Sequence, residues 1–149
     1  MISMTILSGS DILAYIQKGE LKITPFASES LSSAGYDLRS GVDVKIMPGG
    51  HVLVHTMEFV ELGPSVCGQL SIRSSFAREG LLGSFALVDP GFRGQLTLML
   101  ANLGSTPVGI AKGERLAQIV FVRLSKASEK PYSGRYQDSI GTIRSKRNF

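Results

Sequence analysis

Residues that form disulfides and metal sites are scarce in this sequence. It contains one cysteine, Cys67, two histidines and no tryptophan among 149 residues. A single cysteine excludes an intrachain disulfide, and it also excludes a zinc site built from several Cys and His ligands. His51 and His55 are expected on one face of a strand, but no third ligand follows at a suitable spacing. We therefore interpret Cys67 as a small buried apolar residue and the histidines as polar strand positions.

Long apolar runs and two common catalytic motifs are also missing. No apolar run approaches the roughly 20 residues of a membrane span, and the first residues, MISMTILSGSD, lack the basic start and long apolar core of a signal peptide. We therefore expect a cytoplasmic protein without membrane association. Neither GxxxxGK[ST] nor GxSxG occurs, which excludes a P-loop and the nucleophile elbow of serine hydrolases.

The chain carries only a modest excess of positive charge, with a net charge of +4. Part of this excess lies in the last residues, IRSKRNF, which we interpret as a solvated end. No basic stripe interleaved with aromatic residues is present, so we expect no nucleic-acid partner. The charge fits attraction to a polyanionic small molecule equally well.

Strand-length apolar segments separated by turns dominate the rest of the sequence. The chain is 43% hydrophobic with 17 glycines and fits a single domain over residues 1–149. Because the strands alternate with turns and not with helices, we predict an all-β sandwich or jelly roll. The predicted strands cover 42–47, 51–62, 66–72, 84–89, 94–102 and 115–124.

Both ends of the chain depart from this pattern. One short helix is predicted from Asp11 after an N-cap at Ser10, with Ile12, Leu13 and Ile16 on one face and Gly19 at its end. From about residue 128 the sequence becomes polar and glycine-containing, which predicts a mobile C-terminal arm. Such an arm can also fold over a bound ligand and exclude water.

The segment 72–98, IRSSFAREGLLGSFALVDPGFRGQLTL, concentrates groups suited to phosphate chemistry. Arg73 and Arg78 offer guanidinium groups and the intervening serines offer hydroxyls, both of which bind phosphate oxygens. Asp89 follows an apolar run and precedes Pro90-Gly91, so we expect it on a rigid corner where a carboxylate can deprotonate water. Together these residues indicate a nucleotide hydrolase.

Five separated segments resemble the dUTPase and dCTP deaminase superfamily in order and spacing. They are SAGYDL (33–38), RSSFAREG (73–80), ALVDPGFRGQLTL (86–98), GERLAQIVF (113–121) and PYSGRYQDSIG (131–141). The double serine, Arg78 and the arm sequence resemble the dCTP deaminase-like branch, and RSSFAR and VDPGFRGQLTL with their short connection look most like the archaeal-type dUTPases within it. The resemblance implies a distorted jelly roll, a homotrimer with active sites shared between subunits, Mg²⁺ held mainly by the substrate triphosphate, and dUTP as substrate.

The resemblance also implies a role for each matching residue. Asp89 would be the general base that activates water for attack on the α-phosphorus, giving dUMP and pyrophosphate. Phe92 would pack on the deoxyribose, and backbone groups between Gly83 and Val88 would read uracil. Asp37 would order the metal-water shell or the second motif's arginine, and with Asp89 it could form a carboxylate pair that raises one pKa.

Phosphate and arm contacts make up the remaining implied roles. The predicted phosphate-binding residues are Arg73, Ser74, Ser75, Arg78 and Gln118. In the arm, Tyr136 and Gln137 are expected as further substrate contacts. Asp138 departs from the form of the branch, which often has glycine there, and adds a negative charge near a triphosphate.

One departure separates the two activities of the superfamily. Deaminases and bifunctional enzymes carry a glutamate on the strand after the third motif, and the corresponding residue here is Met99. A thioether cannot usefully accept or donate a proton, so dUTP hydrolysis is the main prediction. The alternatives are a dCTP deaminase, alone or bifunctional, and a catalytically weak nucleotide-binding regulatory protein of the same fold.

Overall fold

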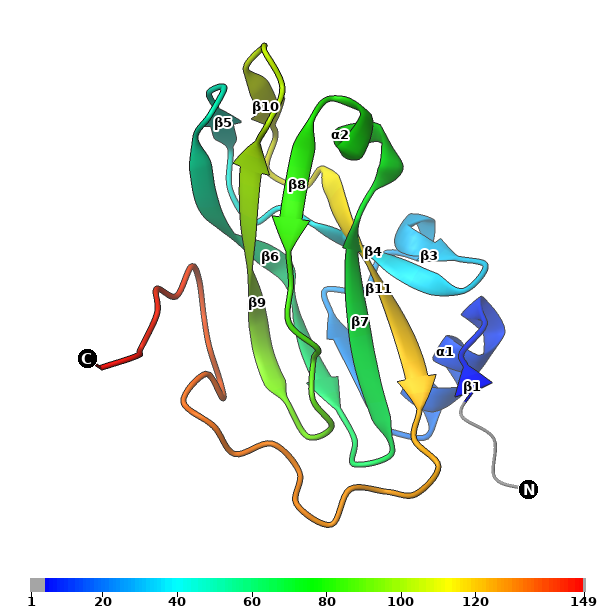
Figure 1. The fold of residues 1–149 in the computed structure, drawn as a ribbon. Coiled ribbons are helices and arrows are strands. Elements are labelled where there is room, and N and C mark those ends of the chain that lie inside the picture. The colour runs from blue at the N-terminus through cyan, green and yellow to red at the C-terminus, as the bar shows by residue number, and fades with distance from the viewer. Residues whose placement is uncertain (1–4, 149) are drawn as a thin grey trace.

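Two antiparallel sheets form the body of the protein in the computed structural model, which describes residues 5–148 (Figure 1). The first sheet contains β1 (Thr5–Ile6), β3 (Leu31–Ser32), β4 (Gly35–Arg39), β7 (Val66–Ile72) and β11 (Arg115–Arg123), with β11 paired to β1, β4 and β7. The second sheet has the order β2-β6-β9-β8, with β2 (Leu21–Thr24), β6 (His51–Leu62), β8 (Leu81–Ser84) and β9 (Arg93–Asn102). A small ribbon joins β5 (Val44–Ile46) to β10 (Val108–Ile110).

Isolated bridges connect the two sheets at both sides. Gly68 of β7 pairs with Val88, which follows β8, and Ser40 after β4 pairs with Thr56 of β6. The sheets therefore wrap around one core as a nearly closed sandwich. This arrangement confirms the predicted all-β, jelly-roll-like fold.

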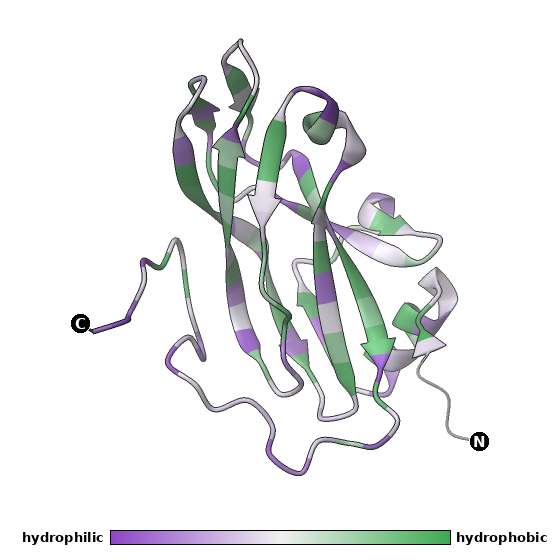
Figure 2. Cartoon of the chain, viewed as in Figure 1, coloured by the Kyte–Doolittle hydropathy of each residue, from purple (hydrophilic) through white to green (hydrophobic). Residues whose placement is uncertain are grey.

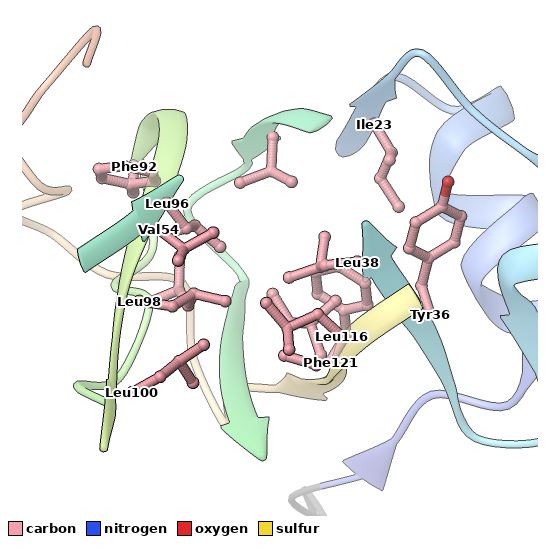
Figure 3. Packing of buried hydrophobic residues seen from close by; sticks show 14 of the residues in the cluster. Ile23, Tyr36, Leu38, Val54, Phe92, Leu96, Leu98, Leu100, Leu116 and Phe121 are labelled. Carbon is pink, nitrogen blue, oxygen red and sulfur yellow. The ribbon is translucent and has the colours of Figure 1, made fainter. Parts of the chain in front are cut away.

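Alternating burial along the strands builds that core. In β9 the even-numbered residues Leu96, Leu98 and Leu100 are buried, while the odd-numbered ones between them are partly exposed. Figure 2 shows the corresponding mixture of hydrophobic and hydrophilic positions along the strands. In Figure 3 the leucines of β9 face Leu116 and Phe121 of β11 across the core. Removing such apolar surface from water is the main stabilising contribution to a fold of this kind.

A bulge in β6 lies between His55 and Phe59, where two extra residues stand opposite β9. Side chains satisfy the interrupted ladder, because the Thr56 hydroxyl accepts a hydrogen bond from the Leu96 amide at 3.0 Å and donates one to the carbonyl of Glu58. The fully buried Glu58 carboxylate pairs with Arg39 at 2.7 Å. This pairing raises the pKa of the Arg39 guanidinium, and it neutralises a charge that would be costly to bury alone.

The first helix begins two residues earlier than predicted. α1 spans Gly9–Gln17, and its N-cap is Ser8, not Ser10. The Ser8 hydroxyl accepts a hydrogen bond from the Asp11 amide, and the Asp11 carboxylate accepts one from the Ser8 amide, so two otherwise unpaired amides are satisfied together. Gly19 follows the C-cap with a φ of 75°, as expected of a glycine that ends a helix.

The apolar face of α1 is narrower than predicted. Ile12 is fully buried and Ile16 packs against the core, but Leu13 is 41% exposed. Leu13 and Ile12 are adjacent in sequence and so are separated by roughly 100° around the helix. Only one of them can face the sheet fully.

Two segments between β7 and β9 are not extended strands. Residues 74–78, which follow the predicted strand 66–72, form a short helix, α2 (Ser74–Arg78), with the buried ring of Phe76 on its inner side. The predicted strand 84–89 is wrong, because β8 ends at Ser84 and only Val88 bridges onward. Ala86 and Leu87 are exposed, whereas Phe85 packs against the core and Val88 is buried in it, so only part of this apolar run enters the core.

The last residues follow an irregular course along the second sheet. After β11 the described chain forms no further helix or strand, and it passes below the sheets and then rises beside β9 (Figure 1). Within residues 5–148, no helix has the length and apolar character needed to cross a membrane.

Candidate active site

A cavity of about 490 Å³ lies between β9, the segment 84–89 and the C-terminal arm, here residues 128–148. Leu53, Leu70, Phe85, Leu87 and Met99 supply much of its apolar wall. Asp89 is the single carboxylate among its lining residues. The predicted site residues Asp89, Phe92 and Tyr136 all line this cavity.

The backbone holds Asp89 on a short, well-anchored corner. Val88 exchanges two backbone hydrogen bonds with Gly68, at 2.8 and 2.9 Å, directly before Asp89. The Asp89 carbonyl then accepts a hydrogen bond from the Phe92 amide, and Gly91 adopts a φ of 86° that closes the turn. The Asp89 carboxylate remains exposed to solvent, where it can accept a proton.

Cys67 lies beside Asp89 at the start of β7. Burial raises the pKa of the Cys67 thiol, and the negative charge of Asp89 raises it further. The thiol is therefore protonated near neutral pH and a poor nucleophile. Its hydrogen-bond acceptor is the Val122 carbonyl at 3.7 Å. These contacts agree with a structural role for Cys67, although the residue is only partly buried.

Met99 of β9 lines the cavity. In the strand register it stands opposite Leu53 of β6 and Ser84 of β8, and all three line the cavity. At the other end Phe92 is buried and meets Tyr132 of the arm edge-on, with 5.6 Å between ring centroids. The cavity thus has an apolar centre between β9 and the arm, with Asp89 near Phe92.

Three other predicted residues, Asp37, Arg73 and Gln118, gather in a second place together with Arg115, and these four residues are here named the Asp37 cluster. The Asp37 carboxylate is 3.2 Å from Arg73 Nε and 3.7 Å from Arg115 Nη1, and Asp37 is only 8% exposed. Gln118 pairs with Asp37 across β11 and β4 and donates a hydrogen bond to the Ser32 hydroxyl at 3.0 Å. Two guanidinium groups around one carboxylate leave this cluster with net positive charge.

The remaining predicted phosphate ligands lie next to this cluster on α2. Arg73 is the N-cap residue of α2, and its amide donates a hydrogen bond to the Leu116 carbonyl at 3.1 Å. Ser74, Ser75 and Arg78 follow on the helix and are exposed. Arg73, Ser74 and Ser75 are thus presented together at the end of β7.

Asp89 and the Asp37 cluster lie at opposite ends of β7. Asp89 sits beside Cys67 near the start of the strand, whereas Arg73 follows its last residue. At about 3.3 Å per residue, the intervening strand separates them by roughly 20 Å. The expected carboxylate pair of Asp37 and Asp89 therefore does not form within one chain, and Asp37 pairs with arginines instead.

The two predicted arm residues have different surroundings. Tyr136 lines the cavity. Gln137 does not line it. Its side chain accepts a hydrogen bond from the Arg93 amide at 2.8 Å and donates one to the Gly91 carbonyl at 2.9 Å. Within this chain Gln137 therefore positions the arm on the turn that follows Asp89.

Sequence reasoning missed three arginines. Arg115 joins Asp37 only because β11 pairs with β4, Arg144 of the basic tail lines the cavity, and Arg93 binds the arm. Each of these contacts joins segments that are far apart in the chain, so the local sequence around the arginine does not predict it. The one available indication is that Arg115 and Arg93 fall inside the motifs that resemble the superfamily. The described residues contain no group of three or more His, Cys, Asp or Glu side chains arranged to hold a metal ion.

Comparison with known proteins identifies the family. A model described as dCTP deaminase-like matches residues 43–124. A dCTP deaminase of Pyrococcus horikoshii is 49% identical over 143 residues, covering 86% of this chain and 92% of the relative. A probable deoxyuridine 5'-triphosphate nucleotidohydrolase of Sulfolobus islandicus rod-shaped virus 1 is 36% identical and covers 95% of this chain and 98% of its own length.

A solved structure supports the fold independently. An EIAV dUTPase superposes with a TM-score of 0.61 at 23% identity, covering 77% of this chain and 96% of that one. At this identity the likeness concerns the fold. The family model and the long matches to close relatives carry the assignment, and the chain belongs to the dUTPase and dCTP deaminase superfamily.

Proposed function

We propose that this enzyme hydrolyses dUTP to dUMP and pyrophosphate. The observation that carries the proposal is the composition of the cavity, which is lined by one carboxylate, Asp89, with Met99 at the middle of β9. One exposed carboxylate suffices to activate a water molecule. Deamination at C4 of cytosine needs a proton shuttle close to the base, and Met99 cannot act as one.

Asp89 performs the central chemical step in this proposal. Its carboxylate accepts a proton from a water molecule as the water oxygen attacks the α-phosphorus. The new P–O bond gives dUMP, and the bond to the bridging oxygen breaks so that pyrophosphate leaves with the electron pair. The anchored corner between Val88 and Phe92 keeps the base in position, which matters because phosphoryl transfer depends mainly on orientation and charge.

The Asp37 cluster supplies phosphate binding from a neighbouring subunit. A separation of roughly 20 Å along β7 is too large for Asp89 and Arg73 of one chain to act on the same α-phosphate. We propose a homotrimer in which Arg73, Ser74, Ser75, Arg78 and Gln118 of one subunit meet the cavity of another. Asp37 then orients Arg73, because it holds the guanidinium Nε while Nη1 donates a hydrogen bond to the Arg115 carbonyl at 3.4 Å, and Nη2 is directed to phosphate oxygens in this proposal.

The cavity accommodates the nucleoside in the same proposal. Phe92 packs against the deoxyribose, backbone groups between Gly83 and Val88 read the base, and Tyr136 covers it from the arm. Mg²⁺ prefers oxygen ligands and retains several waters, so it fits a chain whose described residues offer no cluster of three carboxylates or histidines. When bound with the triphosphate, the ion neutralises phosphate charge.

Deamination of dCTP is the second candidate function. The names of the close relatives favour it over dUTP hydrolysis, since the Pyrococcus protein at 49% identity is named dCTP deaminase. In that case a group other than Met99 would have to move protons at the base. A protein that binds a nucleotide with weak turnover is the third candidate.

Product analysis separates these candidates. The purified protein is incubated with dUTP, dCTP or dTTP and Mg²⁺, and the products are separated by ion-exchange chromatography. Formation of dUMP from dUTP with dCTP unchanged is expected, and Asp89→Asn should abolish it while Glu129→Gln, an exposed carboxylate control, should not. Conversion of dCTP to dUTP or dUMP would establish the deaminase, and binding of dUTP without turnover would establish the regulatory protein.

A further inference from the structure

A series of contacts joins the C-terminal arm to one face of β9. Three successive outward residues of β9 each bind the arm: Arg93 binds Asp138, Gln95 binds Gly141 and Thr97 binds Ile143. The Gln95 side chain accepts a hydrogen bond from the Gly141 amide at 2.6 Å, and the Thr97 hydroxyl accepts one from the Ile143 amide at 3.0 Å. Because alternate strand residues point to one side, these contacts run in step along the strand.

The first contact of this series, between Arg93 and Asp138, is an ion pair. Arg93 Nε lies 2.8 Å from one oxygen of Asp138, and Arg93 Nη2 lies 2.9 Å from the other. This two-pronged geometry is the favourable one for arginine and carboxylate. It lowers the pKa of the Asp138 carboxyl and raises that of the Arg93 guanidinium. Glu61 stands opposite Arg93 in the register and adds to the second effect.

Asp138 is also the one non-glycine residue with positive φ among those described, at 59°. Asparagine and aspartate tolerate this conformation better than most residues, and glycine tolerates it best. An aspartate at position 138 therefore has a higher conformational energy than a glycine would have there. The ion pair with Arg93 is the contact that this side chain provides.

The arm also approaches the backbone of the sheet closely. The Gln95 amide donates a hydrogen bond to the Ser139 carbonyl, and the Asp138 amide donates one to the Arg93 carbonyl, both at 2.8 Å. A Cβ atom at Gly94 would lie 3.0 Å from the Ser139 nitrogen. The absence of a side chain at Gly94 is thus part of the docking site for the arm.

The docked arm completes the cavity of its own chain. Tyr132, Tyr136, Ser139, Ile143 and Arg144 form the wall on that side. All five lie within six residues of Asp138, so the ion pair holds the part of the arm that contributes this wall. It also neutralises the Asp138 charge, which would otherwise repel a polyanion entering the cavity.

We propose that Arg93 and Asp138 are positioning residues that hold the C-terminal arm closed over the cavity of the same chain. Their effect on the arm is independent of the reaction, whereas their effect on turnover rests on the proposed function. Both residues are half exposed, and exposed ion pairs make small contributions, so the effect is a change in the population of the closed arm.

Hydrogen exchange of the full-length protein tests this proposal directly. Asp138→Asn keeps the shape and the tolerance for positive φ but removes the charge, and Arg93→Gln removes the partner. Each variant should exchange the Gly141 and Ile143 amides about two- to fivefold faster, and the double variant should add nothing further. Lys45→Gln removes an exposed charge on β5 and should leave these rates unchanged. Unchanged exchange in both single variants, or additive effects in the double variant, would overturn the proposal.

Nucleotide kinetics then separate this proposal from the proposed function. With an active enzyme, Asp138→Asn should raise KM for the nucleotide by a similar factor, with a smaller change in kcat, because closure and not the chemical step is altered. Faster amide exchange in a protein that hydrolyses no nucleotide would retain the positioning role and reject the proposed reaction. Faster exchange with unchanged KM in an active enzyme would show that the arm closes without serving the site, and would overturn the role in turnover.

Discussion

The cavity and the Asp37 cluster contrast in how the chain builds them. The cavity combines β9, an irregular segment and the arm around a largely apolar space with one exposed carboxylate. The Asp37 cluster joins neighbouring strands β4 and β11 with the end of β7, and its charges touch one another at 3.2 to 3.7 Å. One place can enclose an apolar group and activate water, whereas the other can bind an anion, and neither does both.

Their separation is the reason why the proposed reaction calls for more than one copy of the chain. A nucleoside triphosphate has an uncharged, planar base at one end and charged phosphates at the other. In one subunit the groups suited to these ends lie roughly 20 Å apart along β7. Two copies placed side by side can bring the cavity of one against the cluster of the other, as a closed symmetric assembly does.

The largest effect on turnover is expected from a substitution in the cavity, at the proposed general base. Asp89→Asn should reduce kcat for dUTP about 10²- to 10⁴-fold, because the amide cannot accept the proton of the attacking water. Binding of a non-hydrolysable dUTP analogue, measured by calorimetry, should change little. Retained turnover in this variant would remove Asp89 from the chemical step.

At the anion-binding end, Arg73→Gln should reduce kcat/KM about 10- to 100-fold, the range for one lost hydrogen bond to a charged group. Mixing this variant with Asp89→Asn after partial unfolding should restore activity at roughly a quarter of the sites, because each intact site draws its two halves from different subunits. Failure of the mixture to recover activity, with trimers reassembled, would show that the site is not shared.

The part of the cavity wall that the arm forms can be altered without replacing Asp89 or any charged residue of the Asp37 cluster. A Cβ atom at Gly91 would lie 2.5 Å from Pro131 and 2.9 Å from the Tyr132 nitrogen, so Gly91→Ala should displace the start of the arm. We expect KM for the nucleotide to rise several-fold, roughly 1 kcal/mol of binding free energy. Gly49→Ala is the matched control, since Gly49 has a similar φ of 77° but no neighbour within 4 Å. Equal KM values in the two variants would contradict the docked position of the arm.

The smallest effect concerns the placement of Asp89 itself and needs no substrate. Because the charge of Asp89 adds to burial in raising the pKa of Cys67 above its ordinary value of 9.0, Asp89→Asn should lower that pKa. A larger thiolate fraction then reacts faster with iodoacetamide at pH 8. Glu129→Gln is the control, and equal alkylation rates in all three proteins would place Asp89 away from Cys67.

Much of the fold followed from the sequence because burial alternates so regularly. The bulge in β6 escaped prediction for the same reason. It contains two extra residues, and an insertion of two preserves which side chains face the core. A pattern of period two therefore continues through it, with Thr56 and Glu58 inside as polar exceptions.

The structure differs from the sequence-based prediction where side-chain contacts outweigh the local residue pattern. The helix starts at Ser8 because Asp11 completes a reciprocal cap, although Ser10 is also a suitable capping residue. The apolar run before Asp89 predicted a strand, but its exposed residues project beside the cavity. Motif resemblance identified the candidate residues, whereas their division between two ends of β7 needed the strand pairing.

The ion pair between Arg93 and Asp138 makes the effects of substitution at these two positions interdependent. An arginine at position 93 without its partner adds positive charge beside a cavity that we propose to take a polyanion, and this is tolerable. An aspartate at position 138 alone adds repulsion and an unfavourable φ of 59°. Replacing Asp138 by glycine would therefore remove the charge and the conformational cost together, whereas replacing Arg93 alone would leave both in place.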